Sequence, residues 1–398
     1  MRIVDKHLPL KRVKARKIDV PYMTGEWKEA IRKKRNYAKK FSQSKTKENM
    51  ELMKKWRNNA TRLRRKAIKN YWNAICEDMN NNSRRFYNTF TPFLRTKPKK
   101  DKSLISLNIE GVTHQDQRLV AQEFTNYFCS IADHIGGTDV WGLTEALCYQ
   151  HHSVASINAR HDPNTFSFRR LDRNEVLTAL REINPHRATG YDMLPPRVLE
   201  MTAELLATPL TTLFNLAIEE NRWPSAWKRG EWIPIYKKED PLGKVNYRPV
   251  TVLTAVDKIF EQLICRQLSE MIEPIFDTFL SAYRKHFSCE TTLIHLTEDW
   301  KHAADKGHAP VVLSTDMSKA FDSLHPNLLL AKLKAYGLSD PSLGLMPSYF
   351  DDRGNRTRVG NYTSAWKAAK RGWPQGSSLG PLLWNVYQND LFLSLIHI

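Results

Sequence analysis

One stretch decides the fold: Val311-Val312-Leu313-Ser314-Thr315-Asp316-Met317-Ser318-Lys319-Ala320-Phe321-Asp322. Its first three residues form an apolar, β-branched run, which predicts a buried strand. Asp316 follows this run, so its carboxylate would be held rigidly while its oxygens reach a cleft. Mg²⁺ prefers such oxygen ligands. The alternative is an ordinary acid between a strand and a helix, because chain position alone does not make an acid catalytic. The other motifs of the chain decide between these two interpretations.

The length and composition limit the class of protein. A chain of 398 residues with 41% hydrophobic residues can build two or three domains with a core. It contains no apolar run of about 18 residues, so no membrane span is expected. Its first residues lack the apolar centre of a signal peptide. The five cysteines are odd in number, far apart and free of Cys-x-x-Cys spacing, which favours a reducing compartment over disulfides or zinc.

The net charge of +19 is concentrated near the N-terminus. The first hundred residues contain 30 Lys and Arg against 8 Asp and Glu, a balance of +22. The remainder has 61 − 30 = 31 basic and 42 − 8 = 34 acidic residues, a balance of −3. This distribution predicts contact with a polyanion, and nucleic acid is the expected partner. The alternative is a solvated basic linker.

The basic region has a helical pattern. Residues 1–22 lack periodicity and indicate a flexible arm, and Thr24 is expected to cap a helix. After a break at 42–46, a second helix repeats apolar residues at spacings of three and four, which predicts a helical hairpin with a narrow apolar seam. Its charged faces would remain free for phosphates. The expected nucleic-acid-binding residues are Arg32, Lys33, Lys34, Arg35, Arg62, Arg64, Arg65 and Lys66.

The rest of the chain alternates helices with short strands. Helices are expected over 115–135, from the capping box at Asp172, and near 205–218, 254–274, 288–304 and 326–337. Residues 136–165 read as irregular, and the pair His151-His152 as surface residues, because no third metal ligand stands at a suitable spacing. Without regular βαβ spacing, the pattern predicts an α+β fold. The expected domains are a basic arm and helical linker over 1–105, a connector over 106–165 and the main domain over 166–398.

The main domain carries a series of motifs in a fixed order. They are Ala188-Thr189-Gly190-Tyr191-Asp192, Ile233-Pro234-Ile235-Tyr236, Asn246-Tyr247-Arg248-Pro249, Lys258-Ile259-Phe260-Glu261, Ser281-Ala282-Tyr283-Arg284, the Asp316 stretch and Pro374-Gln375-Gly376-Ser377-Ser378. Together they resemble the reverse transcriptases of non-LTR (LINE-type) retrotransposons, most closely the jockey-like ones. The resemblance covers roughly residues 165–391. It implies a right-hand polymerase fold, with fingers and a partial palm, preceded by the basic helical hairpin.

The resemblance also implies roles for particular residues. Reverse transcription is phosphoryl transfer from a dNTP to a primer 3′-hydroxyl on an RNA template, with two Mg²⁺ ions held by carboxylates. Asp316 would be the first catalytic, metal-binding acid, and Phe321 would exclude the ribose 2′-hydroxyl. Gln375 and Gly376 would lie against the incoming nucleotide and template. Arg284 and Arg248 would meet phosphates, with a structural salt bridge as the alternative for each. By the same resemblance, the location is intracellular, in nuclear and cytoplasmic ribonucleoprotein.

Part of this machinery is not found in the sequence. The second metal-binding motif of these enzymes is an aromatic-x-Asp-Asp that follows the Gln-Gly motif. Tyr349-Phe350-Asp351-Asp352 matches it literally but precedes Gln375 and is followed by loop residues, so we interpret it as a helix end and a turn. We therefore expect no polymerase activity from this polypeptide alone. The endonuclease domain of such elements is also not found in the sequence.

The C-terminal residues Leu393 to Ile398 look like a translated sequencing adapter, so an assembly artefact is expected there. The competing functional hypothesis is a non-enzymatic nucleic-acid-binding remnant of such an element. Both hypotheses predict RNA binding that weakens with salt.

Overall fold

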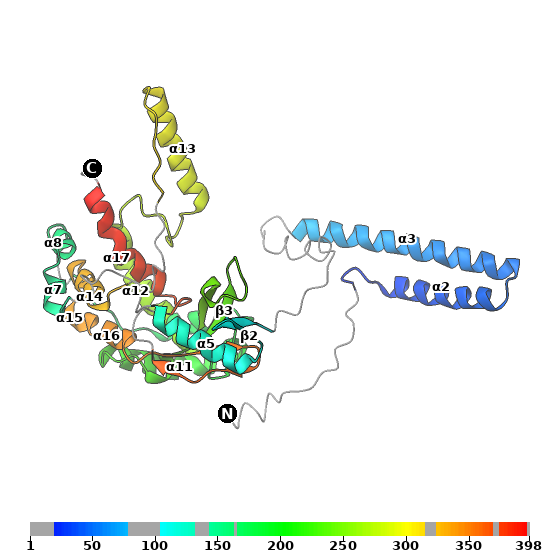
Figure 1. Cartoon of the computed structure of the whole chain (residues 1–398), viewed down its shortest axis with the longest axis horizontal. Coiled ribbons are helices and arrows are strands. Elements are labelled where there is room, and N and C mark those ends of the chain that lie inside the picture. The colour runs from blue at the N-terminus through cyan, green and yellow to red at the C-terminus, as the bar shows by residue number, and fades with distance from the viewer. Residues whose placement is uncertain are drawn as a thin grey trace. The chain divides into compact units, whose positions relative to one another are not determined.

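The structure, a computed structural model, describes residues 20–78, 104–131, 143–162, 165–314, 324–368 and 374–395. The chain divides into two compact units, residues 1–100 and 101–398 (Figure 1). Within the described ranges, no helix is long and apolar enough to cross a membrane. The combination of helices and one main sheet is the α+β class that the sequence predicted.

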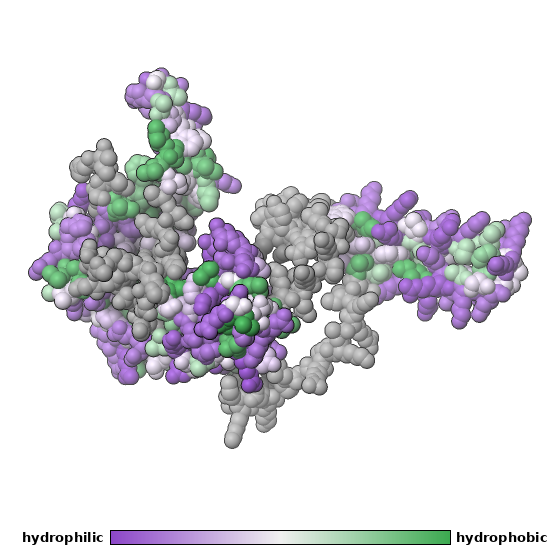
Figure 2. Space-filling view, in the orientation of Figure 1, coloured by the Kyte–Doolittle hydropathy of each residue, from purple (hydrophilic) through white to green (hydrophobic). Residues whose placement is uncertain are grey.

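In its described residues 20–78, the first unit has two helices, α2 (Gly25–Gln43) and α3 (Lys47–Asp78), which pack against each other. Thr24 caps α2 as predicted, and its hydroxyl accepts a hydrogen bond from the Trp27 amide at 3.2 Å. The apolar seam is narrow: Trp27, Ala30 and Ala60 are buried there. Because so little of each helix is apolar, the charged side chains line the outer surfaces of the pair (Figure 2).

The main sheet of the second unit has the order β4-β3-β5-β6, and β7 also pairs with β5. Strand β3 pairs antiparallel with β4 and parallel with β5, so segments more than a hundred residues apart share one sheet. The strands are β3 (Arg229–Tyr236), β4 (Tyr247–Val252), β5 (Gly354–Val359), β6 (Tyr362–Thr363) and β7 (Lys367–Ala368).

Helix α5 (Gln117–Ser130) packs on this sheet. Its Phe124 and Phe128 meet Tyr247 and Trp232 of the strands, with ring centroids 5.0 and 5.6 Å apart. A separate two-stranded hairpin of β1 (Leu107–Ile109) and β2 (Val112–His114) adds Leu107 to the same apolar cluster. Buried aromatic contacts of this kind fix the sheet against its covering helix.

Helices form the larger core of the second unit, and α12 (Ala255–Ile272) has ten buried residues. Its Phe260 stacks on Phe214 at 5.0 Å and meets Trp223 at 4.5 Å. The other helices of this core are α9 (Arg173–Arg181), α10 (Pro196–Met201), α11 (Ala203–Glu219), α14 (Pro326–Ala335), α15 (Asp340–Leu343), α16 (Leu345–Phe350) and α17 (Gly380–Leu395). Short 3-10 turns lie at Ser225–Trp227, Lys244–Asn246 and Glu273–Ile275.

Within the region 136–165, the described residues 143–162 are more regular than predicted. They contain α7 (Glu145–Tyr149) and α8 (His152–Asn158), both of which pack against α14. The expectation failed because both helices are too short to show a helical period in the sequence. His151 caps α8, its Nδ1 accepting a hydrogen bond from the Ser153 amide at 3.3 Å, and His152 is exposed.

The predicted buried strand at Val311–Leu313 is wrong. The structure assigns these residues no regular element, and their exposed fractions are 93%, 62% and 88%. A strand requires a neighbour that accepts and donates its backbone hydrogen bonds, and no strand in the described ranges pairs with this segment. The preceding helix α13 (Cys289–Asp305) also has no buried residue, and Figure 1 shows it projecting from the rest of its unit.

Candidate functional site

Three of the predicted motifs meet where β4 ends and α12 begins. The Thr251 amide on β4 donates to the Gln375 carbonyl at 2.8 Å, which ties the Gln-Gly turn to the strand that carries Arg248. Gly190 of the first motif lies against the same corner, because a Cβ placed there would be 2.9 Å from the Thr254 Cα. Segments separated by up to 185 positions are thus brought to one place, which is the convergence expected of a functional site.

The conformation of the Gln-Gly turn requires glycine at position 376. Gly376 has a φ of +125°, which L-residues rarely adopt, and a Cβ there would lie 2.9 Å from the Thr251 carbonyl oxygen. The residue is exposed, so its surface remains open to a ligand. The sequence predicted a glycine for close backbone approach, and the approach seen here is to β4.

The other end of the turn is held by Glu261 of α12, which is fully buried. Its Oε2 accepts a hydrogen bond from the Ser378 amide at 2.8 Å, and its Oε1 accepts one from the Tyr349 hydroxyl at 2.8 Å. Two contacts therefore position the Gln375–Gly376 turn. On one side Gly376, which has no Cβ, lies close to the backbone of β4, and on the other side the Ser378 amide donates to the buried Glu261 carboxylate. Hydrogen bonds to a carboxylate are stronger than neutral ones, so this support is rigid.

A second buried acid, Asp257, lies one turn before Glu261 on α12. Its Oδ1 accepts from the Trp223 indole at 2.9 Å, and its Oδ2 lies 4.0 Å from Nη2 of the buried Arg353. Burial raises the pKa of Asp257 well above its ordinary value, and the neighbouring Glu261 adds to the effect. Burial likewise raises the pKa of Glu261, although the Arg353 charge opposes this.

Two predicted nucleotide-binding residues, Arg248 and Gln375, belong to the strand and the turn that meet at this corner. Arg248 is exposed on β4, opposite Ile235 of β3, and Gln375 is half-buried in the turn. Asp316 and Phe321, the predicted catalytic acid and steric gate, lie outside the described residues. Their placement beside this corner therefore stays a prediction.

Arg284 occupies a structural position. Its side chain is 9% exposed, and its Nε donates to Glu273 Oε1 at 2.8 Å. Its Nη1 donates to the carbonyls of Asp277 and Leu280 at 2.8 and 2.9 Å, and the guanidinium faces the Phe287 ring. These contacts match the structural alternative that the sequence left open. The phosphate contact of Arg284 stays a prediction.

The literal aromatic-x-Asp-Asp match at Tyr349–Asp352 is a helix end and a turn, as predicted. Helix α16 ends at Phe350, Asp351 follows as its C-cap, and Asp352 has a φ of +53°. Tyr349 is buried and bonded to Glu261, so its ring is part of the core. Nothing in this geometry presents the two acids as a pair on a strand hairpin.

The predicted nucleic-acid-binding cations lie along α2 and α3. Lys33 pairs with Glu29 at 2.9 Å and stands over the Trp56 ring, and Arg62 donates to Asn59. The other predicted residues are exposed, and five of them make no ion pair or hydrogen bond of their side chains within the described range 20–78: Lys34, Arg35, Arg64, Arg65 and Lys66. Their charges are available to an external anion.

In the described part of the chain, no group of three or more His, Cys, Asp or Glu side chains is placed to hold a metal ion. The described residues alone do not fit a metal, and the predicted ligand Asp316 lies outside them.

Comparison with known proteins agrees with the motif order. Residues 235–398 match the family model of the reverse transcriptase (RNA-dependent DNA polymerase), a family that is generally divalent-metal dependent. The chain is 29% identical over 222 residues to the RNA-directed DNA polymerase from the mobile element jockey of Drosophila melanogaster. It is 27% identical over 220 residues to the probable RNA-directed DNA polymerase from transposon BS of the same fly. Each alignment covers 54% of this chain and 24% of the relative.

A more distant match is the Pol polyprotein from the type-1 retrotransposable element R1 of Bradysia coprophila, 26% identical over 234 residues, which is 57% of this chain and 22% of that protein. The chain thus spans about a quarter of the length of these relatives. Residues 235–398 form a reverse transcriptase domain. The predicted resemblance is confirmed: the relatives that this chain matches are RNA-directed DNA polymerases of non-LTR retrotransposons, the jockey element among them.

Sequence reasoning missed the buried support of the turn. Asp257 and Glu261 are spaced four apart on a helix, and Arg353 follows an acidic pair, so all three resemble surface residues in the sequence. The motif Lys258-Ile259-Phe260-Glu261 was recognised, but only as a family marker. The available signal was the apolar character of α12 on both sides of these acids, which predicts a buried helix.

Proposed function

We propose that this chain functions in RNA-directed DNA polymerisation, the transfer of nucleotides from dNTPs to a primer 3′-hydroxyl on an RNA template. The observation that carries the proposal is the family match over residues 235–398, together with the meeting of the family's motifs at the β4–α12 corner. A non-enzymatic remnant of such an element would keep the family match, but it would not need the buried Glu261 support that fixes the turn, so the meeting of the motifs favours the enzyme. The proposal includes an intracellular location in a ribonucleoprotein.

In this proposal, residues 166–398 provide the fingers and part of the palm, residues 1–105 form the basic arm and helical linker, and 106–165 connect them. Asp316 binds Mg²⁺, and Phe321 excludes ribonucleotides. Magnesium would supply charge neutralisation at the transferred phosphate and would activate the primer hydroxyl. Arg248, Gln375 and Gly376 line the nucleotide side of the corner.

The basic helices α2 and α3 would bind the RNA template or the primer strand. Lys34, Arg35, Arg64, Arg65 and Lys66 lie on faces of the helices that the seam leaves free. Phosphate contacts release counterions, so affinity should fall steeply as salt rises. Replacing all five cations by glutamine should reduce the salt slope by up to about 3.5, at about 0.7 per contact with a single strand.

A matched control separates this effect from net charge. Five arginines of the second unit are each paired with a glutamate, so their loss changes the net charge equally without removing a free cation: Arg169, Arg170, Arg173, Arg181 and Arg266. RNA binding is measured by fluorescence anisotropy over a range of salt concentrations. If both five-residue variants lower the slope equally, the assignment to α2 and α3 is wrong.

Primer extension tests the polymerase itself. The printed sequence contains no aromatic-x-Asp-Asp after Gln375, so residues 1–391 are fused to the corresponding downstream segment of the jockey polymerase. The fusion should extend a DNA primer on RNA with dNTPs and Mg²⁺, and the unfused chain should not. Asp316→Asn should abolish extension, whereas Asp352→Asn, in the turn after α16, should preserve it. Extension that survives Asp316→Asn but is lost with Asp352→Asn would reverse the assignment.

A further inference from the structure

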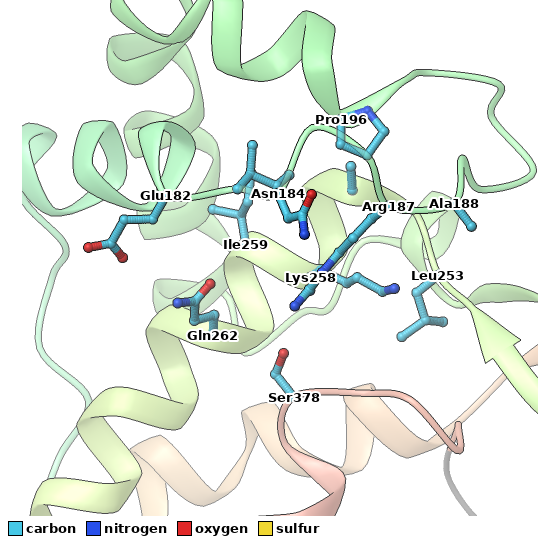
Figure 3. Close-up of a pocket in the computed structure, with 12 residues that line it drawn as sticks. Glu182, Asn184, Arg187, Ala188, Pro196, Leu253, Lys258, Ile259, Gln262 and Ser378 are labelled. Atoms are coloured by element: carbon cyan, nitrogen blue, oxygen red, sulfur yellow. The ribbon is translucent and has the colours of Figure 1, made fainter. Parts of the chain in front are cut away.

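A pocket lies beside the β4–α12 corner, with Leu253, Ala255 and Ser378 in its lining. Its walls come from the loop after α9, the first turns of α12 and the end of the Gln-Gly turn, and its volume is about 120 Å³ (Figure 3). Liquid water occupies about 30 Å³ per molecule, so the pocket has room for a small polyatomic ion. Its polar lining residues are Glu182, Asn184, Arg187, Lys258, Gln262 and Ser378.

Two cations share this pocket without an acid between them. Figure 3 shows the Arg187 side chain crossing close to Lys258. Among the described residues, neither side chain forms an ion pair or a hydrogen bond, and the Arg187 charge lowers the pKa of the half-buried Lys258 in addition to the effect of burial. Two neighbouring positive charges repel each other, so an anion between them would be strongly favoured.

The one acid in the lining does not neutralise them. The Glu182 carboxylate pairs with Arg266 at 2.7 Å, and Figure 3 shows it directed away from Arg187 and Lys258. Asp257 and Glu261 on α12 are committed to Trp223, Tyr349 and the Ser378 amide. The charges of Glu261 and Asp257 raise the pKa of Lys258 and so offset part of the effect of Arg187, but neither acid lines the pocket, and an anion inside it would add to this compensation.

Neutral donors complete the lining. The Asn184 carbonyl oxygen accepts from the His186 amide at 2.9 Å, which leaves its amide group for the pocket. Figure 3 shows the Ser378 hydroxyl directed toward Arg187 and Lys258, and Gln262 lines the same pocket. A guanidinium, an ammonium, two amides and a hydroxyl form a donor set that suits the oxygens of a phosphate.

We propose that this pocket is a phosphate-binding site formed by Arg187 and Lys258, with Ser378 and Gln262 as neutral donors. The ligand is a phosphate group, and under the proposed function its source is a phosphodiester of the bound nucleic-acid strand. Because Ser378 belongs to the Gln-Gly turn, a phosphate bound here connects that turn to the loop at Asn184–Ala188. Anion binding itself does not depend on polymerase activity, so the two proposals can fail separately.

Acetylation of Lys258 measures the site directly. The full 398-residue chain is treated with an acetylating reagent in EDTA, without divalent metal, and modification of each lysine is read by peptide mass spectrometry. Inorganic pyrophosphate at ten times its dissociation constant should slow acetylation of Lys258 about tenfold, whereas chloride at equal ionic strength should not. The exposed Lys285 serves as the internal control. Arg187→Gln should remove the protection at Lys258.

A second measurement covers the case in which Lys258 is unreactive in the free chain. Equilibrium dialysis with labelled pyrophosphate should show one site fewer in Arg187→Gln/Lys258→Met than in the wild type, and the matched pair Arg222→Gln/Lys285→Met should keep it. A short RNA should protect Lys258 if the ligand is a strand phosphodiester, and protection by pyrophosphate alone would assign the site to free phosphates. Equal pyrophosphate binding by both double variants would overturn the site, whatever the outcome of primer extension.

Discussion

Replacing Gly376 by alanine tests whether β4 shapes the Gln-Gly turn. The residue has a φ of +125°, and the new methyl group would lie 2.9 Å from the Thr251 carbonyl oxygen. That oxygen is backbone of a strand paired with β3, opposite Trp232, so it cannot move away without loosening the sheet. Backbone strain costs about 1–3 kcal/mol, and overpacking adds about 1–3 kcal/mol. We expect a loss of at least about 2 kcal/mol at this corner.

The clash between the new methyl group and the Thr251 carbonyl oxygen is relieved with the least loss of structure if the turn moves away from β4. That movement breaks the hydrogen bond from the Thr251 amide to the Gln375 carbonyl, 2.8 Å long in the native chain. Local opening then becomes easier, and 2 kcal/mol corresponds to about 30-fold faster exchange of that amide. Hydrogen exchange of the peptide over residues 247–253, read by mass spectrometry, measures the change.

Gly111→Ala is the matched control. Gly111 has a φ of +85° in the β1–β2 turn, and a Cβ there meets nothing within 4 Å. Gly111→Ala should lower the free energy of unfolding only by the strain of a non-glycine residue at positive φ, about 1 kcal/mol. It should leave hydrogen exchange of the Thr251 amide unchanged. If Gly376→Ala leaves Thr251 exchange at the wild-type rate, the close approach to β4 does not hold the turn and the reasoning fails.

Three further substitutions test the supports around the corner. In Glu261→Gln only one side-chain oxygen remains to accept a hydrogen bond, whereas the carboxylate accepts one from Ser378 and one from Tyr349. The Ser378 amide should therefore exchange faster, and the free energy of unfolding should fall by about 1–3 kcal/mol. Unchanged exchange of the Ser378 amide would argue against this support. The pKa of Asp257 is higher in the folded chain than in the unfolded chain, where it is near 4. The contribution of Asp257 to the free energy of unfolding is therefore fully present below the unfolded pKa and is lost as pH rises through the folded pKa. The melting temperature of the wild type should therefore fall relative to Asp257→Asn between pH 5 and 8, and parallel curves would contradict the burial of its charge. Arg284→Lys should lower the melting temperature, because lysine cannot donate to Glu273 and to carbonyls in a fork; an unchanged melting temperature with weaker dNTP binding would instead support the phosphate role.

Local signals explain what the sequence could predict of the fold. The capping box at Asp172 is present, with Glu175 as its partner, and the last turn of α14 leads into Gly337 with a φ of +112°. Such features depend on a few neighbouring residues, so the chain alone specifies them. The same holds for the glycine of the Gln-Gly turn, whose φ is a local property.

Partners distant in the chain explain what the sequence could not predict. An apolar run such as Val311–Leu313 indicates a strand only if a neighbour pairs with it, and periodicity carries no information about that neighbour. Glu261 shows the reverse case. Its partners Tyr349 and Ser378 lie 88 and 117 residues away, so its burial follows from tertiary structure. In the sequence, a buried acid with such distant partners cannot be told from an acid on a solvent-exposed helix face.

The architecture of the corner changes how activity losses there should be interpreted. Gly376 contacts β4, Ser378 contacts Glu261, and Gly190 contacts Thr254, so each motif positions another motif. A substitution at any of them can therefore lower nucleotide binding by moving the turn, without removing a contact to the nucleotide. The distinguishing observation is Thr251 exchange measured beside dNTP affinity. A residue that touches the nucleotide should lower affinity while that exchange stays unchanged, as we expect for the exposed Arg248, whereas a positioning residue should change both.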